Sequence, residues 1–208
     1  MLGFDIFNKG EIIMKKIISL SAVLLFLIIW AGCREKSRPE LTEQIKNGLR
    51  TDAKNFMDSL KSFLIAEIQK NGIVSAVSVC SDTAQLLTVN YGLSKGLYIK
   101  RVSFKNRNLN NSPDGFESKV LNYFEELQYQ NKLNETNEFI ELIESEGVKS
   151  VRYMKPIIAQ SSCLGCHGDV GRMNPDLKTI LNNKYPNDKA IGYQVGDLRG
   201  AVSIQKTL

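Results

Sequence analysis

Histidine is almost absent from this sequence: one occurs among 208 residues, alongside one tryptophan and four cysteines. A single histidine excludes every site that needs two imidazoles, including zincin-type metalloproteases, non-haem iron facial triads and bis-histidine haems. The excess of one charge is also slight, because 27 Lys and Arg stand against 22 Asp and Glu, a net charge of +5. The basic residues do not gather with aromatics along one segment, so no nucleic-acid partner is expected.

One long hydrophobic run lies near the N-terminus. Lys15 and Lys16 precede the apolar segment Ile17–Ala31. This segment is shorter than the about 20 residues of a membrane span and suits the core of a signal peptide, with a retained single-span anchor as the alternative. Residues 1–13 include two acidic side chains and do not resemble a signal start, so Met14 is a candidate initiator.

The hydrophobic run ends in Ala31-Gly32-Cys33, which resembles the lipobox of bacterial lipoproteins, with Trp30 where leucine is usual. The resemblance implies that residues 1–32 are a signal peptide cleaved before Cys33, and that Cys33 carries a lipid. Residues 33–40 then form a linker to a domain over 41–208. We expect export to the cell envelope, with the lipid anchoring the protein to a membrane on the periplasmic side or at the outer membrane.

Apolar residues in steps of three and four predict a long N-terminal helix from Leu41 to Ile68 that stops at Asn71-Gly72. Further helices are predicted over 73–87, 116–127 and around 177–181. Strands are predicted over 98–104, 148–153 and 198–204, with Pro156 ending any pairing. Strands scattered between helices predict the α+β class, with one antiparallel sheet and helices packed on it.

The chemistry gathers at residues 163–167, which read Cys-Leu-Gly-Cys-His. Two thiols three positions apart can each add to one vinyl group of a haem, and the adjacent His167 is then delivered to the iron as an axial ligand. The attachment machinery works outside the cytoplasm, so the export signal and this motif support each other. The motif predicts one covalent haem c, bound through Cys163, Cys166 and His167.

Three other interpretations of the motif compete with haem attachment. A thioredoxin-like redox pair belongs at a helix start after a βαβ-type strand, which the preceding residues 154–158 do not resemble. A zinc site with Cys80 would need Cys166 and His167 on one tetrahedral metal, which adjacent residues rarely reach. A structural disulfide leaves His167 without a role.

The second axial position of the iron needs a ligand other than histidine, or none. The candidates are Cys80, Met57, Met154 and Met173, with lysine and tyrosine as remoter options. Cys80 is the odd thiol of an exported chain, and a buried structural cysteine is its alternative role. The pattern alone does not separate Cys80 from a methionine.

Four blocks of sequence resemble a family of bacterial haem-c proteins with a PAS-like fold. Residues 76–81 (Ala-Val-Ser-Val-Cys-Ser) resemble its Ala-Ile-x-Val-Cys segment, and residues 101–113 resemble its R-x-S and RNPxNxP signature, with Leu109 where proline is usual. Residues 153–168, which contain the motif, and 185–201 resemble its later blocks, and the likeness runs from about Leu41 to Ile204. Because the four blocks occur in the same order as in the family, the resemblance is more specific than a lone Cys-x-x-Cys-His motif.

The resemblance implies a PAS-like pocket with a single haem c, and selects Cys80 as the second ligand opposite His167. Because a thiolate stabilises ferric iron, we expect the Cys80 bond to weaken on reduction and to open the site to CO or NO. The expected role is a redox or gas sensor acting on a separate redox or signalling partner, with a single-electron carrier as the alternative. An enzyme such as a peroxidase is not expected, since no second histidine is available for acid–base catalysis.

A basic, asparagine-rich segment is the last candidate feature. We expect Arg107, with Asn108 or Asn111, to meet a haem propionate or to brace the pocket, because arginine suits paired contacts with carboxylates. The alternative is a solvated loop whose asparagines make their own turns. Arg199 is a further cation that nothing in the sequence selects.

Overall fold

The structure is a computed structural model that describes residues 41–208. The predicted signal peptide 1–32, the lipid on Cys33 and the linker 33–40 lie outside the described residues. Leu41–Leu208 forms one compact unit. Its helices and strands, in chain order, are α2 (Glu43–Lys95), β1 (Tyr98–Val102), η1 (Leu109–Asn111), α3 (Gly115–Tyr129), β2 (Phe139–Ser145), β3 (Val148–Ile158), η2 (Ser161–Cys163), α4 (Leu164–His167), η3 (Val170–Arg172), α5 (Pro175–Lys184) and β4 (Leu198–Thr207).

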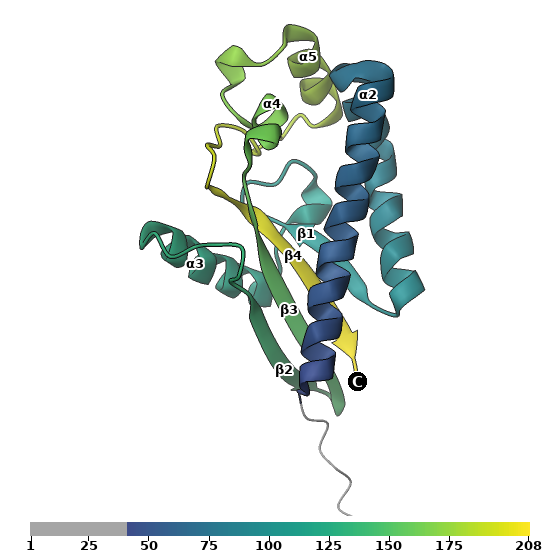
Figure 1. Cartoon of the computed structure of the whole chain (residues 1–208), viewed down its shortest axis with the longest axis vertical. Coiled ribbons are helices and arrows are strands. Elements are labelled where there is room, and N and C mark those ends of the chain that lie inside the picture. Colours follow the sequence, from purple (N-terminus) through teal and green to yellow (C-terminus); the bar gives the residue numbers. More distant parts are fainter. Residues whose placement is uncertain (1–40) are drawn as a thin grey trace, which may run out of the picture. The chain divides into compact units, whose positions relative to one another are not determined.

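Helix α2 is a hairpin of two arms rather than one straight rod (Figure 1). Its backbone leaves the helical region at Gly72, where φ is 77° and ψ is 166°, a conformation that glycine adopts at little cost. The first arm (43–71) and the second arm (73–95) pack side by side, and the Tyr91 hydroxyl donates to the Asp52 carbonyl oxygen at 3.1 Å. The predicted stop at Asn71-Gly72 is confirmed, and the second arm runs past Leu87 to Lys95.

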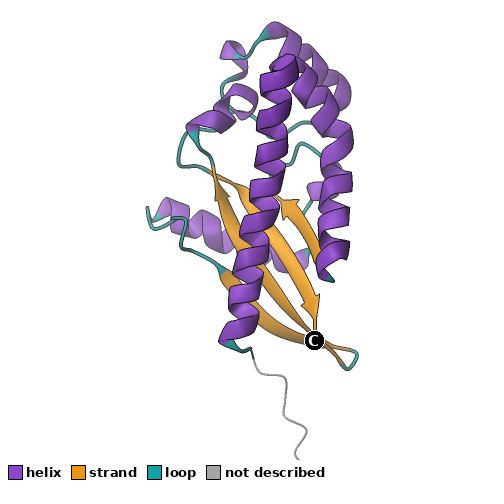
Figure 2. Ribbon diagram, turned by 45° about the vertical axis from the view of Figure 1, so that its right-hand side comes forward, coloured by secondary structure: helices purple, strands orange, loops and turns teal. Residues whose placement is uncertain are grey.

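The four strands form an antiparallel sheet in the order β1-β4-β3-β2 (Figure 2). Strand β2 was not predicted, because its Phe-Ile-Glu-Leu-Ile-Glu-Ser sequence is only half-buried at a sheet edge. The prediction that Pro156 ends pairing is wrong, since β3 continues to Ile158 and Pro156 is paired with Ala201. Pairing with β2 has already ended at Met154, so on that side Pro156 stands at an edge, where a missing N–H is tolerated.

Alternation along the strands divides the core between the two faces of the sheet. Val202 and Ile204 of β4 pack under the first arm of α2 with Phe56. Their neighbour Ala201 faces the other way and packs against α3 with Phe124. This period of two buries both faces. The α+β class is confirmed, with a PAS-like antiparallel sheet, flanking helices and a long N-terminal helix.

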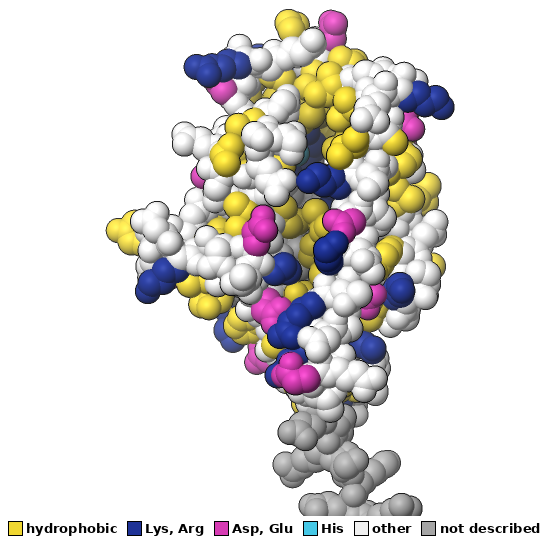
Figure 3. All heavy atoms as spheres, viewed as in Figure 1, with side chains coloured by type: hydrophobic (Ala, Val, Ile, Leu, Met, Phe, Trp, Pro, Cys, Tyr) yellow, Lys and Arg dark blue, Asp and Glu magenta, His cyan; other side chains and the backbone are white. Residues whose placement is uncertain are grey.

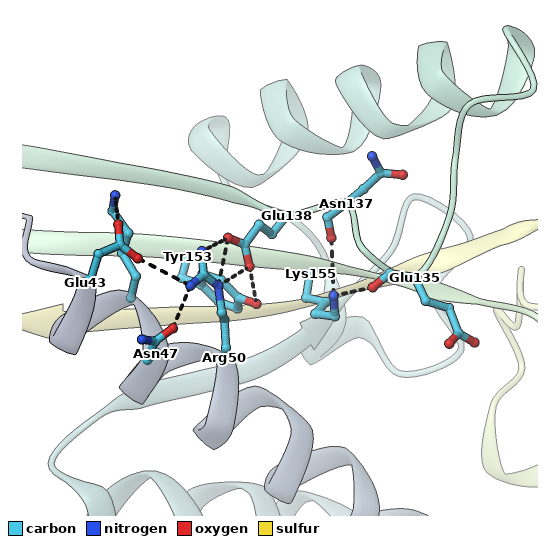
Figure 4. Close-up of polar contacts among 9 residues, drawn as sticks. Glu43, Asn47, Arg50, Glu135, Asn137, Glu138, Tyr153 and Lys155 are labelled. Carbon is cyan, nitrogen blue, oxygen red and sulfur yellow. Dashed lines mark hydrogen bonds and ion pairs between the residues drawn. The ribbon is translucent and has the colours of Figure 1, made fainter.

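A polar cluster fastens the start of α2 to the sheet (Figure 4). The Arg50 guanidinium donates from Nε to both oxygens of Glu138 at 3.0 Å, and Nη2 lies 2.6 Å from Oε1. The Tyr153 hydroxyl donates to the same carboxylate at 3.2 Å. Arg50 lies on α2, Glu138 immediately precedes β2, and Tyr153 lies on β3, so one carboxylate joins three segments.

Candidate cofactor site

The Cys-x-x-Cys-His motif lies between the end of β3 and the start of β4. The backbone of Ala159, just after β3, exchanges two hydrogen bonds with the segment before β4: its N–H donates to Asp197 at 2.8 Å, and its carbonyl accepts from Gly196 at 2.9 Å. At the other end of the motif, the His167 carbonyl accepts from the Tyr193 N–H at 2.9 Å. Both ends of the motif are therefore held by the chain that leads into β4.

The His167 ring is oriented by one hydrogen bond. Its Nδ1 lies 2.7 Å from the Ala190 carbonyl oxygen. A carbonyl oxygen only accepts, so Nδ1 carries the proton and Nε2 keeps a free lone pair. Burial lowers the pKa of His167 to about 2, and the nearby Arg199 and Arg107 act in the same direction. The imidazole is therefore neutral at ordinary pH, which is the form that binds a metal.

The described residues contain three cysteines, all of them free thiols: Cys80, Cys163 and Cys166. The Cys163 sulfur accepts a hydrogen bond from the Gln160 N–H at 3.4 Å, and burial raises the pKa of Cys166. Within residues 41–208 no group of three or more His, Cys, Asp and Glu side chains is arranged to hold a metal ion. Neither the disulfide nor the zinc interpretation gains support from this geometry.

The second arm of α2 packs directly on the motif. Ile73 reaches to within 3.6 Å of the position of a Cβ on Gly165, and Val77 shares a hydrophobic cluster with Cys166. Cys80 follows Val77 by three residues, so it lies on the same side of the arm, one turn further along. Burial raises the pKa of Cys80, as does the Glu67 carboxylate, while Arg101 opposes them.

The methionine candidates are separated by their packing. Met154 is fully buried against α3 on the opposite face of the sheet, and Met57, on the first arm of α2, is half-buried against the core cluster under that arm. Met173 belongs to the same hydrophobic cluster as Cys166 and Val77. The structure therefore brings Cys80 and Met173 to the motif, whereas Met154 lies in the sheet core and Met57 packs against the core from the first arm of α2.

Arg107 braces the motif. Its Nε donates to Asp188 at 2.9 Å, and its Nη2 donates to the Cys166 carbonyl oxygen at 2.5 Å. The Asn108 side chain accepts from the Asn110 N–H at 2.9 Å and begins the short helix η1. This contact favours the local-turn interpretation of Asn108.

Sequence reasoning missed the residue that organises the Arg107 loop. Asn106 is buried, and its side-chain amide donates to the Ser112 hydroxyl at 2.9 Å and to the Asn108 carbonyl at 3.1 Å. Asp188, the partner of Arg107, was also missed, because it lies 81 residues further along the chain. Only its place in the resembling block 185–201 singles it out in the sequence.

More positive charge surrounds the motif than the sequence suggested. The Tyr193 ring carries Lys105 Nζ at 4.2 Å from its centroid and the Arg199 guanidinium carbon at 5.1 Å. Arg101, on β1, is close enough to both Cys80 and His167 to alter their pKa values.

In the space-filling view, hydrophobic side chains flank a hollow in the upper part of the molecule (Figure 3).

Fold and site together define an α+β protein in which a Cys-x-x-Cys-His segment, a free thiol on a helical hairpin and several arginines meet beside one antiparallel sheet. The chain belongs to the Tll0287-like family, whose sequence model matches residues 8–206. It is similar to the crystal structure of the cyanobacterial heme-protein Tll0287, at 23% identity and a TM-score of 0.56 over 78% of this chain and 94% of that one. This likeness shows the fold. No curated protein matches the chain.

Proposed function

We propose that this protein binds one haem c covalently, through thioether bonds from Cys163 and Cys166, with His167 as an axial ligand. The hydrogen bond from His167 Nδ1 to Ala190 carries the proposal, because it presents a neutral imidazole with Nε2 free beside two free thiols. Arginines near His167 suit a cofactor with two carboxylates. The donors present therefore fit a haem, and the similar structure is that of a heme-protein.

Cys80 is the proposed second axial ligand. It stands on the arm of α2 that packs on the motif, whereas Met154 is buried in the sheet core and Met57 packs against the core from the first arm. Met173 shares the motif's cluster, but it follows the motif by only six residues on a mostly exposed turn. The resemblance of residues 76–81 to the family's cysteine segment supports Cys80.

The proposed role is a membrane-tethered sensor of redox state or of a diatomic gas. When bound, the haem would supply one-electron redox chemistry and a position for CO or NO wherever Cys80 is displaced. Cys80 belongs to the helical hairpin and His167 to the segment between β3 and β4, so release of one ligand would uncouple two separate parts of the fold. A separate redox or signalling protein would receive the change. We propose no enzymatic activity.

A single-electron carrier is the second candidate. Ser161, Ser162 and Gly165, in and beside the motif, are exposed. If the haem is attached at this exposed segment, electrons could be exchanged with a partner protein without any change of axial ligand. A carrier would bind CO or NO weakly and keep its structure on reduction. A sensor would bind the gas and change its structure.

The test is spectroscopic, on protein produced in the periplasm together with the c-type attachment machinery. Visible and electron paramagnetic resonance spectra are recorded for the ferric and ferrous forms, and for the ferrous form with CO. We expect a covalent haem and a low-spin thiolate signature that Cys80→Ala abolishes, while Met173→Leu, the matched control, retains it. A wild-type protein without covalent haem refutes the cofactor, and an unchanged Cys80→Ala spectrum refutes the ligand.

A further inference from the structure

Arg101 is a cation at the proposed haem site that meets no side chain of opposite charge within residues 41–208. Among residues 41–208 its guanidinium forms no ion pair and no hydrogen bond, and loss of water lowers its pKa. The neighbouring Arg199 lowers it further. Partly buried arginines normally meet a carboxylate, because a desolvated charge left alone is costly.

The position of Arg101 follows from the strand that carries it. Ile99, two residues earlier on β1, packs in the core beneath α2. Alternation along the strand places Arg101 on the same face of the sheet, toward the helical hairpin that carries Cys80. Arg101 acts on the pKa of Cys80 and on that of His167. Arg101 therefore lies near both residues that would hold the haem iron.

The other two arginines of the site differ in their hydrogen-bond and ion-pair partners. Arg107 is occupied by Asp188 and by the Cys166 carbonyl. Arg199 donates a long hydrogen bond of 3.4 Å to the Lys105 carbonyl and lies over the Tyr193 ring, with no ion pair in the described part of the chain. Two cations, Arg101 and Arg199, are therefore available to an anion, and Arg107 is not.

We infer that Arg101 and Arg199 bind the haem propionates, and that Arg107 positions the motif without touching them. The inference rests on the proposed function, since it needs the haem to be present. Arginine offers a planar pair of donors that matches a carboxylate, so each guanidinium would form charge-assisted hydrogen bonds. Arg101 and Arg199 would therefore recognise a ligand that carries two carboxylates on an apolar ring.

The test compares variants of the haem-loaded full chain by resonance Raman spectroscopy of the propionate bending vibrations, and by the midpoint potential as a function of pH. Arg101→Gln and Arg199→Gln should each shift the propionate bands, lower the midpoint potential and move the onset of its pH dependence to higher pH. Arg101→Lys should keep most of the potential while losing the paired hydrogen-bond signature. Arg172→Gln, which removes the same charge at an exposed side chain five residues after His167, should match wild type.

The outcomes separate this inference from the proposed function. Wild-type protein without covalent haem refutes the function itself. A haem-loaded wild type whose propionate bands and potential are unchanged in Arg101→Lys and Arg199→Gln overturns the inference alone. A change confined to the thiolate signature in the Arg101 variants also overturns it, because Arg101 would then serve Cys80. If Arg101→Gln does not load haem, Arg101→Lys and Arg199→Gln still decide.

Discussion

The hydrogen bond between His167 and the Ala190 carbonyl accounts for several properties of the site. It selects the tautomer, fixes the ring and leaves one nitrogen for a metal. Since burial and nearby arginines keep the ring neutral, protonation does not compete with metal binding at physiological pH. A backbone acceptor also carries no charge, so the imidazole is not made more anionic as it would be by a carboxylate.

Gly200 is required by a close approach between β4 and β1. Its φ is 147°, and a Cβ there would clash with the Val102 carbonyl oxygen and crowd the Ser103 side chain. Backbone cannot move aside as a flexible side chain can, so we expect Gly200→Ala to destabilise the fold by about 2 kcal/mol or more. Chemical denaturation of the haem-loaded protein measures the change.

The matched control for Gly200 is Gly48, an exposed helical glycine with no atom within 4 Å of the point where a Cβ would lie. Gly48→Ala should stabilise the protein by roughly 0.5–1 kcal/mol, because alanine is the better helix former. Equal effects at the two glycines would contradict the proposed steric role of Gly200.

Among the helices and strands, α3 is held by charge as well as by packing. Glu117 is fully buried near its first turn, 2.9 Å from Lys100 of β1 and 3.5 Å from Arg152 of β3. Asp114 caps the same helix and also pairs with Arg152 at 2.8 Å. Two strands and one helix therefore meet at a single carboxylate, whose removal would leave Lys100 without a carboxylate partner, while Arg152 would keep Asp114.

Helix α2 is attached to the sheet through a pair that depends on pH. The hydrogen bond from Arg50 holds the pKa of Glu138 below its usual value of 4.5. A carboxylate whose pKa is lowered by folding contributes stability above that value and loses it as the pH falls through the folded pKa. Glu138→Gln should therefore cost about 1 kcal/mol at pH 6, a modest figure because solvent reaches the pair.

The difference between wild type and Glu138→Gln should shrink as the pH is lowered from 4.5 toward 3, measured by urea unfolding at each pH. Asp58→Asn removes an exposed carboxylate that pairs with Lys54, and should change stability little at any pH. A Glu138→Gln penalty that stays constant down to pH 3 would show that the ion pair contributes nothing and that the amide disturbs packing.

For the protein as a whole, the proposed lipid tether would place the domain near a membrane. The predicted lipid on Cys33 stands eight residues before Leu41, where the compact unit begins. With so short a linker, the domain would remain within a few nanometres of the bilayer surface. A partner would then be found in the envelope rather than by free diffusion.

We expect Cys33→Ser to abolish lipid attachment, measured by incorporation of labelled palmitate and by partition between membrane and soluble fractions. Cys80→Ala is the control, because it also removes one cysteine and should leave partition unchanged. Labelled, membrane-bound Cys33→Ser protein would instead favour a retained span at Ile17–Ala31.

Local patterns were enough to predict the helix break at Gly72, the motif at 163–167 and the terminal strand. Each follows from neighbouring residues: a glycine that ends a helix, two thiols three positions apart, an alternation of apolar side chains. Strand β2 was missed because an edge strand with two glutamates lacks a clear alternation. The effect of Pro156 was misjudged because tolerance of proline depends on which neighbouring strand has already ended.

The identity of the motif's residues, and hence the expected chemistry, is contained in the linear order of the chain, because attachment needs only a fixed spacing. Which groups surround that motif depends on contacts across long sequence separations. Arg107 meets Asp188 after 81 residues, Cys80 lies on a helical hairpin, and Arg101 meets no carboxylate in the described part of the chain. Burial and charge at the site arise from packing of distant segments, so folding alone determines which cation is satisfied and which remains available.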